Sequence, residues 1–227
     1  RLGQKPLCYF RNAEQLVFAS ELQALARHPE LPRELDHQAI HDYLSLQYIP
    51  APHTVYRGVR KLPPAHYLAL DVDSGEARLQ PYWHCRFDHK PTQSYAEAKA
   101  RLRELLADAV RLRLMADVPL GAFLSGGLDS TIVVGLMAEA CREPVHTFTV
   151  GFAQAAYDER AAARVAATRF ATAHREQEVD PADFAVLERL IGHFGEPFCD
   201  ASLLPTFLLS RFTREQVTQD IEQPTRE

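Results

Sequence analysis

The chain has 227 residues, 46% of them hydrophobic, and a formal net charge of −5 at pH 7. This length allows one large domain or two small ones, with ample apolar content for a core. The acidic balance gives no basic footprint for nucleic acid, and no apolar run approaches the ~18 residues of a membrane-spanning helix. We therefore expect neither nucleic acid nor membrane as a partner.

Four cysteines, Cys8, Cys85, Cys141 and Cys199, are widely separated and form no C-x-x-C pair. This spacing argues against a disulfide scaffold and against a zinc ribbon. A reduced, cytoplasmic setting is the prediction. No signal-peptide pattern is present, and the chain opens on Arg1 as if already inside a domain. We expect it to be a fragment of a longer protein.

The first part of the chain predicts sheet with little helix. Two hairpins are expected, the first from apolar runs at 6–10 and 15–19, the second from strands at 66–71 and 78–83 around the turn 73–75. Two helices are expected between them, at 20–27 and from the N-cap Asp36 to about Leu46. Residues 1–87 are thus predicted to form one β-rich domain, followed by a polar linker at 88–94.

From Tyr95 the pattern changes to helices alternating with strands. Leucines recur at helical spacing between Leu102 and Leu112, where we expect core packing. The elements expected after that helix are a strand at 119–124, a helix at 131–141, a strand at 145–150, a helix from Asp158 to about Ala171, a strand at 174–179 and a helix starting at Asp180-Pro181. Such alternation predicts an α/β domain with a parallel sheet over residues 95–227.

The segment Ser125-Gly126-Gly127-Leu128-Asp129-Ser130 lies between an apolar strand and a helix. Adjacent glycines let the backbone turn sharply and present N–H groups, and the following helix directs its positive dipole end to the same place. A carboxylate at Asp129 would repel phosphate unless a cation intervenes, which predicts Mg²⁺ bridging phosphate oxygens. A Walker A motif is excluded because its Lys is absent. The loop therefore predicts pyrophosphate binding.

The loop is similar to that of the glutamine-hydrolysing asparagine synthetases, in which it binds ATP and pyrophosphate. Further segments resemble the same family. They are Gly3-Gln4-Lys5-Pro6-Leu7, Phe18-Ala19-Ser20-Glu21, Lys61-Leu62-Pro63-Pro64, Tyr82-Trp83, Val145 to Phe152, Tyr157 to Ala166, and Glu196-Pro197-Phe198-Cys199-Asp200-Ala201-Ser202 with Pro205. The resemblance implies part of an N-terminal-nucleophile glutaminase domain over 1–87. It also implies part of an adenine-nucleotide α-hydrolase-like, PP-loop ATP pyrophosphatase domain over 95–227.

By that resemblance, Leu124 and Val150 flank the nucleotide base, while residues 125–130 hold the pyrophosphate and Asp129 places Mg²⁺. A substrate pocket would include Glu196, Asp200 and Ser202, although an ordinary helix-start loop explains these three residues equally well. The implied reaction is amidation of aspartate to asparagine through β-aspartyl-AMP, with ATP and glutamine as co-substrates and AMP and pyrophosphate as products. Whether the protein forms a homodimer is left open.

The sequence departs from the family in four places. None of the cysteines is an N-terminal nucleophile, and the family's S-G-D-G-G-D-E segment is absent after Thr218. Ala65 stands where a glycine is usual, and alanines occupy positions 171 and 173 in a turn before a strand. We therefore name no catalytic residue and expect the chain to be inactive on its own.

Two other functions stay open at this point: an amide-forming adenylating synthetase with another carboxylate substrate, and a non-catalytic remnant that binds nucleotide. His84, Cys85 and His89 could suggest a metal site, but they fall in the expected linker without a fourth ligand. We interpret them as solvated linker residues. Asp158 and Glu159 are interpreted as helix-capping residues, and Cys199 as a small buried thiol.

Overall fold

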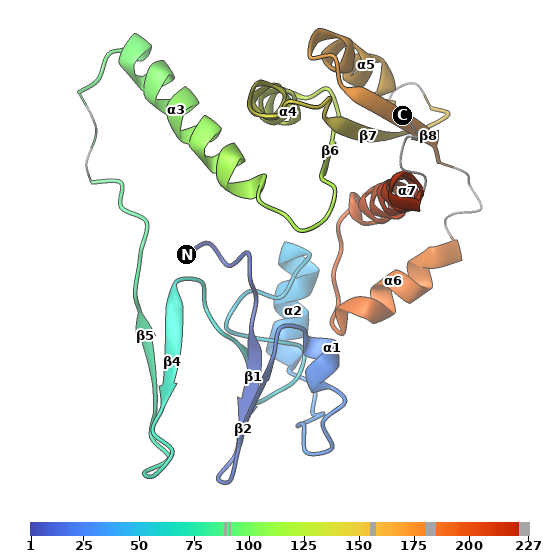
Figure 1. The fold of residues 1–227 in the computed structure, drawn as a ribbon. Coiled ribbons are helices and arrows are strands. Elements are labelled where there is room, and N and C mark those ends of the chain that lie inside the picture. Colours follow the sequence, from blue (N-terminus) through green and yellow to red (C-terminus); the bar gives the residue numbers. More distant parts are fainter. Residues whose placement is uncertain (89, 91, 155–157, 180–184, 223–227) are drawn as a thin grey trace. The chain divides into compact units, whose positions relative to one another are not determined.

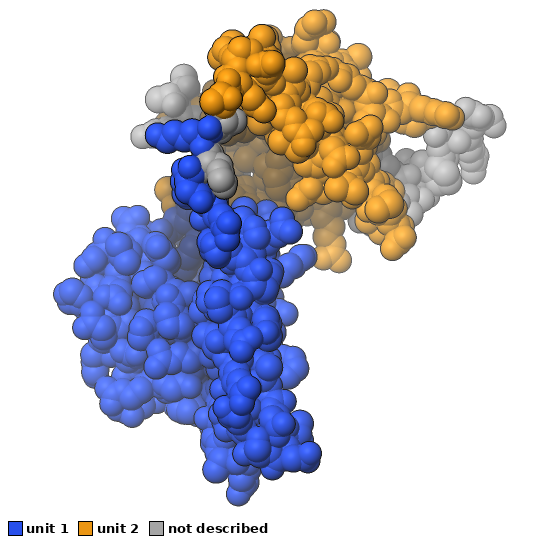
Figure 2. Space-filling model, turned by 90° about the vertical axis from the view of Figure 1, so that its left-hand side faces the viewer, with its two compact units in different colours: residues 1–90, 185–200 blue, residues 91–184, 201–227 orange. Residues whose placement is uncertain are grey.

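A computed structural model describes residues 1–227 except 89, 91, 155–157, 180–184 and 223–227, and it leaves the side chains of 218–222 undescribed. The chain divides into two compact units (Figure 2). Unit 1 comprises residues 1–90 and 185–200, and unit 2 comprises residues 91–184 and 201–227. Residues 185–200 thus belong to unit 1, whereas the residues on either side of them in the sequence belong to unit 2.

Unit 1 is built on antiparallel strands. β1 (Cys8–Arg11), β2 (Leu16–Ala19) and β3 (Val59–Lys61) form a sheet in the order β2-β1-β3, and β4 (His66–Leu70) pairs with β5 (Ala77–Pro81). Both expected hairpins are confirmed. β3 was not predicted, because it is three residues long and only its Val59 is buried.

Three helices belong to unit 1: α1 (Leu22–Leu25), α2 (His37–Leu46) and α6 (Leu187–Phe194). Asp36 caps α2 as expected, since its carboxylate accepts hydrogen bonds from the N–H groups of Gln38 at 3.0 Å and Ala39 at 3.2 Å. The core of the unit comprises Cys8, Phe10, Leu22, Leu25, Leu31, Ala39, Ile49, Val55 and Val59.

Unit 2 is an α/β layer around a parallel sheet, as the alternation predicted. Its strands β6 (Gly121–Phe123), β7 (His146–Gly151) and β8 (Ala173–Glu178) stand in the order β6-β7-β8 (Figure 1). Its helices are α3 (Tyr95–Arg113), α4 (Leu128–Ala140), α5 (Arg160–Arg169) and α7 (Leu203–Glu222). α5 and α7 both pack on β7, and α3 packs along α4.

Side chains between the sheet and its helices fill the core of unit 2. Leu124, Val134 and Ala163 are at most 1% exposed and cluster together. Phe148 of the central strand is fully buried and meets the ring of Phe212 from α7 edge-to-face, with ring centroids 5.9 Å apart. The central strand β7 is therefore covered by both α7 and α5.

Some expectations for unit 2 need correction. The leucine stripe of α3 is core only in part, because Leu102, Leu105 and Leu112 are 57%, 50% and 60% exposed, whereas Leu106 packs against the buried cluster around Val110. α4 begins at Leu128, so residues 128–130 of the loop segment form its first turn. The N-cap of α5 is Glu159 rather than Asp158. The helix expected to start at Asp180-Pro181 lies outside the described residues.

Two alanines adopt backbone conformations that favour glycine. Ala65 has φ 60° and Ala171 has φ 51°. Left-handed backbone of this kind costs an L-residue roughly 1–2 kcal/mol, because Cβ approaches the following carbonyl oxygen. Ala65, which stands where the family usually has a glycine, thus adopts a backbone conformation that favours glycine.

Candidate functional site

The loop joins the edge strand of the parallel sheet to a helix. Leu124 follows β6 directly, is 1% exposed, and donates its N–H to the carbonyl of Phe148 at 2.9 Å. Ser125, Gly126 and Gly127 then turn the chain, and α4 begins at Leu128. The order of strand, glycine turn and helix that the sequence predicted is confirmed, and it places the loop at the carboxyl edge of the sheet.

Gly126 is held against α5. Its φ is +75°, and a Cβ built there would lie 2.5 Å from the carbonyl carbon of Ala162 and 2.6 Å from the backbone nitrogen of Ala163. Real Cβ atoms do not approach backbone atoms this closely, so both the conformation and the contact require glycine. The loop is thereby pressed onto the first turns of the neighbouring helix.

Gly127 serves a different purpose from Gly126. It is the N-cap of α4 with φ −67° and ψ 163°, a conformation open to any residue, and it offers no side-chain cap. The first intrahelical bond runs from the N–H of Thr131 to the carbonyl of Gly127. The preceding N–H groups of the first turn have no acceptor within the helix, which is the arrangement that binds anions.

The two serines of the loop hydrogen-bond to each other. Their hydroxyl oxygens, Ser125 Oγ and Ser130 Oγ, are 2.9 Å apart, and Ser125 Oγ also accepts the N–H of Gly127 at 3.2 Å. The Ser130 hydroxyl is within 3.2 Å of the Gly127 carbonyl. These bonds close the loop across its two glycines and keep both hydroxyls beside the start of α4.

Asp129 projects from the exposed first turn of α4. Among the described residues it forms no ion pair or hydrogen bond. A carboxylate in a first helical turn is favourable to the helix dipole in its own right. Its side chain is therefore accessible beside the anion-binding N–H groups, where a divalent cation could be shared with a phosphate.

Leu124 and Val150 stand on neighbouring strands at the same edge. Phe123 pairs with Phe148 in the β6–β7 register, so Val150 falls opposite the start of the loop. The Leu124 side chain lies in the core with Val134 and Ala163. Val150 is half-buried.

A second charged group at this edge was missed by sequence reasoning. Arg160 donates to both carboxylate oxygens of Asp158, at 2.8 and 2.9 Å, and lies 3.0 Å from Glu178 Oε2. The hydrogen bonds from Arg160 hold the pKa of Asp158 below its usual value. A Cβ on Gly151 would collide with the Arg160 side chain, so the guanidinium crosses the end of β7. The spacing of Asp158 and Arg160 was visible in the sequence, where Asp158 had been interpreted as a cap.

The three residues expected to form a substrate pocket do not fall in one unit. Glu196 and Asp200 belong to unit 1, whereas Ser202 belongs to unit 2. Glu196 forms an ion pair with Lys61 and accepts the N–H of Val55 at 3.3 Å. The carbonyl of Ser202 accepts the N–H of Thr206 at the start of α7.

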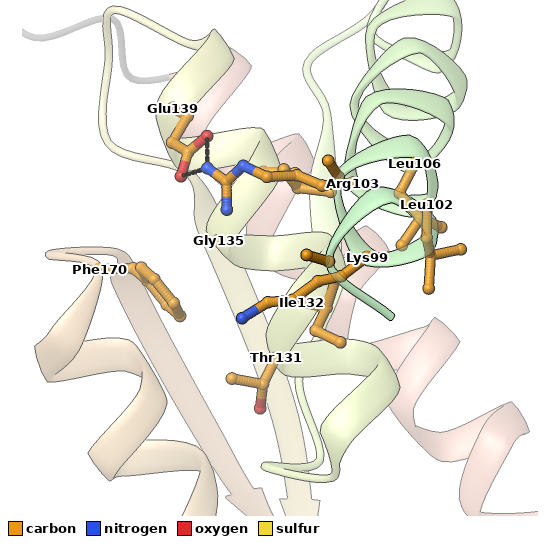
Figure 3. A pocket seen from close by; sticks show the side chains of 12 residues that line it. Lys99, Leu102, Arg103, Leu106, Thr131, Ile132, Gly135, Glu139 and Phe170 are labelled. Carbon is orange, nitrogen blue, oxygen red and sulfur yellow. Dashed lines mark hydrogen bonds and ion pairs between the residues drawn. The ribbon is translucent and has the colours of Figure 1, made fainter. Parts of the chain in front are cut away.

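A groove in unit 2 lies between α3 and α4 (Figure 3). Its volume is about 540 Å³, and its lining is mostly apolar, with the Phe170 ring against Gly135. The Arg103 side chain reaches across the groove and donates hydrogen bonds to the two carboxylate oxygens of Glu139, at 2.7 and 2.8 Å. None of the residues 125–130 lines the groove, so it is separate from the loop.

No group of three His, Cys, Asp or Glu side chains that could hold a metal ion occurs among the described residues. Of the residues considered for such a site, His89 lies outside the described part, while Cys85 is exposed. Cys199 is exposed too, contrary to the expectation of a buried thiol. No helix in the described part is long and apolar enough to cross a membrane.

Comparison with known proteins assigns the family. A model of the asparagine synthase family matches residues 101–219, which include the loop. The chain belongs to the asparagine synthase family. A model of the glutamine amidotransferase domain matches residues 1–83. The glutaminase-like and synthetase-like resemblances noted in the sequence are thus confirmed at the level of families.

Curated relatives agree with this assignment. "Putative asparagine synthetase (glutamine-hydrolyzing) 2" of Methanocaldococcus jannaschii is 35% identical over 222 residues, covering 96% of this chain and 43% of its own length. "Asparagine synthetase (glutamine-hydrolyzing) 1" of Bacillus subtilis is 29% identical over 218 residues, covering 95% of this chain and 34% of its own length. The chain therefore spans less than half the length of these relatives.

Proposed function

We propose that the chain carries the ATP-binding part of a glutamine-dependent asparagine synthetase. The proposed reaction is amidation of aspartate to asparagine through β-aspartyl-AMP, with release of AMP and pyrophosphate. The observation that carries the proposal is the loop at residues 125–130, which lies at the carboxyl edge of a parallel sheet and at the N-terminus of α4. The PP-loop ATP pyrophosphatase fold is part of this proposal.

The residues present fit a pyrophosphate. Gly126 lets the backbone lie close to α5 without a side chain in the way, and Gly127 leaves the first-turn N–H groups of α4 uncovered. The hydroxyls of Ser125 and Ser130 stand beside those N–H groups as further donors. The Leu128 side chain is 76% exposed. Together these groups would stabilise negative charge on the departing pyrophosphate.

Asp129 is the residue proposed to place Mg²⁺. A carboxylate next to an anion site is unfavourable without a cation, and Asp129 has no cationic partner among the described residues. When bound, Mg²⁺ would neutralise charge that develops on the leaving pyrophosphate. Leu124, through its backbone, and Val150 are proposed to flank the base.

The match of residues 1–83 to a glutamine amidotransferase domain supports glutamine as the nitrogen source. Glutamine hydrolysis supplies ammonia, which attacks the activated carboxylate while the site excludes water. A cytoplasmic location stays a prediction, and a homodimer stays open.

The acceptor is tested by exchange of labelled pyrophosphate into ATP, measured with each candidate carboxylate in the protein expressed from the complete reading frame. Aspartate-dependent exchange is expected. Exchange with another carboxylate alone would reassign the substrate, and no exchange with any carboxylate would favour a non-catalytic nucleotide-binding role. The same assay on these 227 residues tests whether they suffice.

The role of Asp129 is tested by measuring ATP affinity of Asp129→Ala with and without Mg²⁺. With Mg²⁺ we expect a loss of about tenfold, equal to about 1.4 kcal/mol. Without Mg²⁺ the variant should bind at least as tightly as the parent, since a repulsive charge has been removed. Asp117→Ala is the matched control, because Asp117 is an exposed carboxylate before the opposite end of β6. Equal losses in both conditions would contradict the assignment.

A further inference from the structure

One segment belongs to the synthetase by sequence and to unit 1 by packing. Residues 185–200 fall within the match to the asparagine synthase family, yet they form one compact unit with residues 1–90, which contain the amidotransferase match. We call residues 185–200 the arm. Its helix α6 lies beside α1 (Figure 1). The chain thus returns to unit 1 after building most of unit 2.

Backbone contacts hold the arm at several points. The Gln23 side chain donates to the carbonyl of Gly192 at 2.7 Å. Gly195, with φ +72°, brings the arm so close to α1 that a Cβ there would lie 3.0 Å from the backbone nitrogen of Gln23. Near the end of the arm, the N–H of Cys199 donates to the carbonyl of Gln47 at 3.1 Å. The arm is therefore seated along its length in unit 1.

A partly buried ion pair also holds the arm. Glu196 and Lys61 form a salt bridge in which their side chains are only 14% and 24% exposed. The other carboxylate oxygen of Glu196 accepts the N–H of Val55, and Lys61 Nζ also donates to the carbonyl of Ile49 at 2.7 Å. Because a half-buried carboxylate that loses its cation is costly, this pair fixes where the arm lies.

Soon after this anchor the chain is fixed again, in unit 2. α7 begins at Leu203, and its Leu204 and Leu208 are 7% and 3% exposed. Phe212 of the same helix packs on Phe148 in the central strand of the sheet that carries the loop. A short stretch of chain therefore connects a fixed point in unit 1 with a helix fixed to that sheet.

We propose that the Lys61–Glu196 pair is a positioning contact that couples the amidotransferase-like unit to the synthetase sheet. Loss of the Lys61 cation would release Glu196, and the chain that follows Glu196 leads directly to the start of α7 at Leu203. This inference rests on the proposed function, because coupling matters only where glutamine-derived nitrogen is used for synthesis. Glu196 then acts through the backbone that follows it rather than by contact with substrate.

The test uses Lys61→Met in the protein expressed from the complete reading frame, with the ratio of glutamate to asparagine formed as readout. We expect this ratio to rise about fivefold, while synthesis from added ammonia stays within about twofold of the parent. Lys61→Arg should restore the ratio. Arg57→Met is the matched control, since Arg57 pairs with Glu34 in the same unit but with 58% and 65% of the side chains exposed, and it should leave the ratio unchanged.

Hydrogen exchange separates the anchor from the coupling. In Lys61→Met the Cys199 amide should exchange about tenfold faster or more, and the Thr206 amide, which donates to the Ser202 carbonyl in the first turn of α7, should also accelerate. The proposal is overturned if the exchange rate of the Cys199 amide is unchanged. It is also overturned if the Cys199 amide exchanges faster while the exchange rate of the Thr206 amide or the product ratio stays unchanged. If the parent makes no asparagine even from ammonia, the proposed function fails, and the two amides then decide the inference.

Discussion

Replacing Gly126 by alanine perturbs the loop where the structure leaves no room. The new Cβ would lie 2.5 Å from the carbonyl carbon of Ala162, 2.6 Å from its Cβ and 2.6 Å from the nitrogen of Ala163. These atoms belong to the backbone and shortest side chain of α5, so no rotamer change can relieve the contact. Ala163 is fully buried in the core, so α5 can retreat only by opening the packing behind it.

The cost of Gly126→Ala has two parts. A φ of +75° costs an alanine roughly 1–2 kcal/mol, and overpacking against a fixed backbone costs about 1–3 kcal/mol. Since the two effects arise from different atoms, we expect unit 2 to lose about 2–5 kcal/mol of unfolding free energy. Gly127→Ala is the matched control, because its φ is −67° and its nearest neighbour would be Ser125 Oγ at 3.2 Å. That variant should lose less than about 1 kcal/mol.

Urea unfolding followed by far-UV circular dichroism measures both variants. Exchange of the Leu124 amide, which is bonded to the Phe148 carbonyl, reports on unit 2 alone. Similar losses in the two variants, or a loss below about 1 kcal/mol for Gly126→Ala, would refute the steric reasoning. The loop would then be able to move away from α5.

Three further predictions concern stability. Ala65→Gly and Ala171→Gly should each stabilise the protein by about 0.5–1 kcal/mol, since relief of left-handed strain exceeds the added chain entropy; a lower urea midpoint in both would contradict this. Asp36→Ala should cost about 1 kcal/mol at pH 7 through the lost cap. Because the Ala39 N–H holds the pKa of Asp36 below the ordinary 3.8, this cost should shrink as the pH falls below that value, as urea midpoints at several pH values will show. Hydrogen bonds from Arg164 lower the pKa of Glu176, so Arg164→Gln should raise it in a carboxyl NMR titration and make the acid loss of stability shallower.

Local chemistry made part of the fold predictable. Asp36 before an apolar helical pattern predicted the start of α2, and its carboxylate does cap that helix. The glycine pair between strand and helix predicted the loop, because few other residues permit such a turn. In both cases the residues that decide the structure are neighbours in sequence, so their physical effect can be read without knowing the rest of the fold.

Contacts between distant residues were not predictable in this way. Lys61 and Glu196 are ordinary charged residues in sequence, and only the return of the arm to unit 1 brings them together. The α3 leucines carried the correct helical spacing, but spacing does not say whether a second layer covers them, and Leu102 is 57% exposed. Periodicity predicts which residues share a face, whereas burial depends on what the topology places against that face.

The loop residues differ in whether the fold or the ligand requires them. Gly126 is required by the contact with α5, and the two serines bond each other across the turn. Asp129, unlike Gly126 and the two serines, has no partner in the described part of the chain, and its contribution to the helix dipole is worth about 0.3–1 kcal/mol. The loop variants should therefore rank in opposite order for their effect on stability and for their effect on ATP binding. Gly126→Ala should cost more stability than any other loop variant, while Asp129→Ala should unfold almost as the parent does and lose its affinity for ATP only when Mg²⁺ is present.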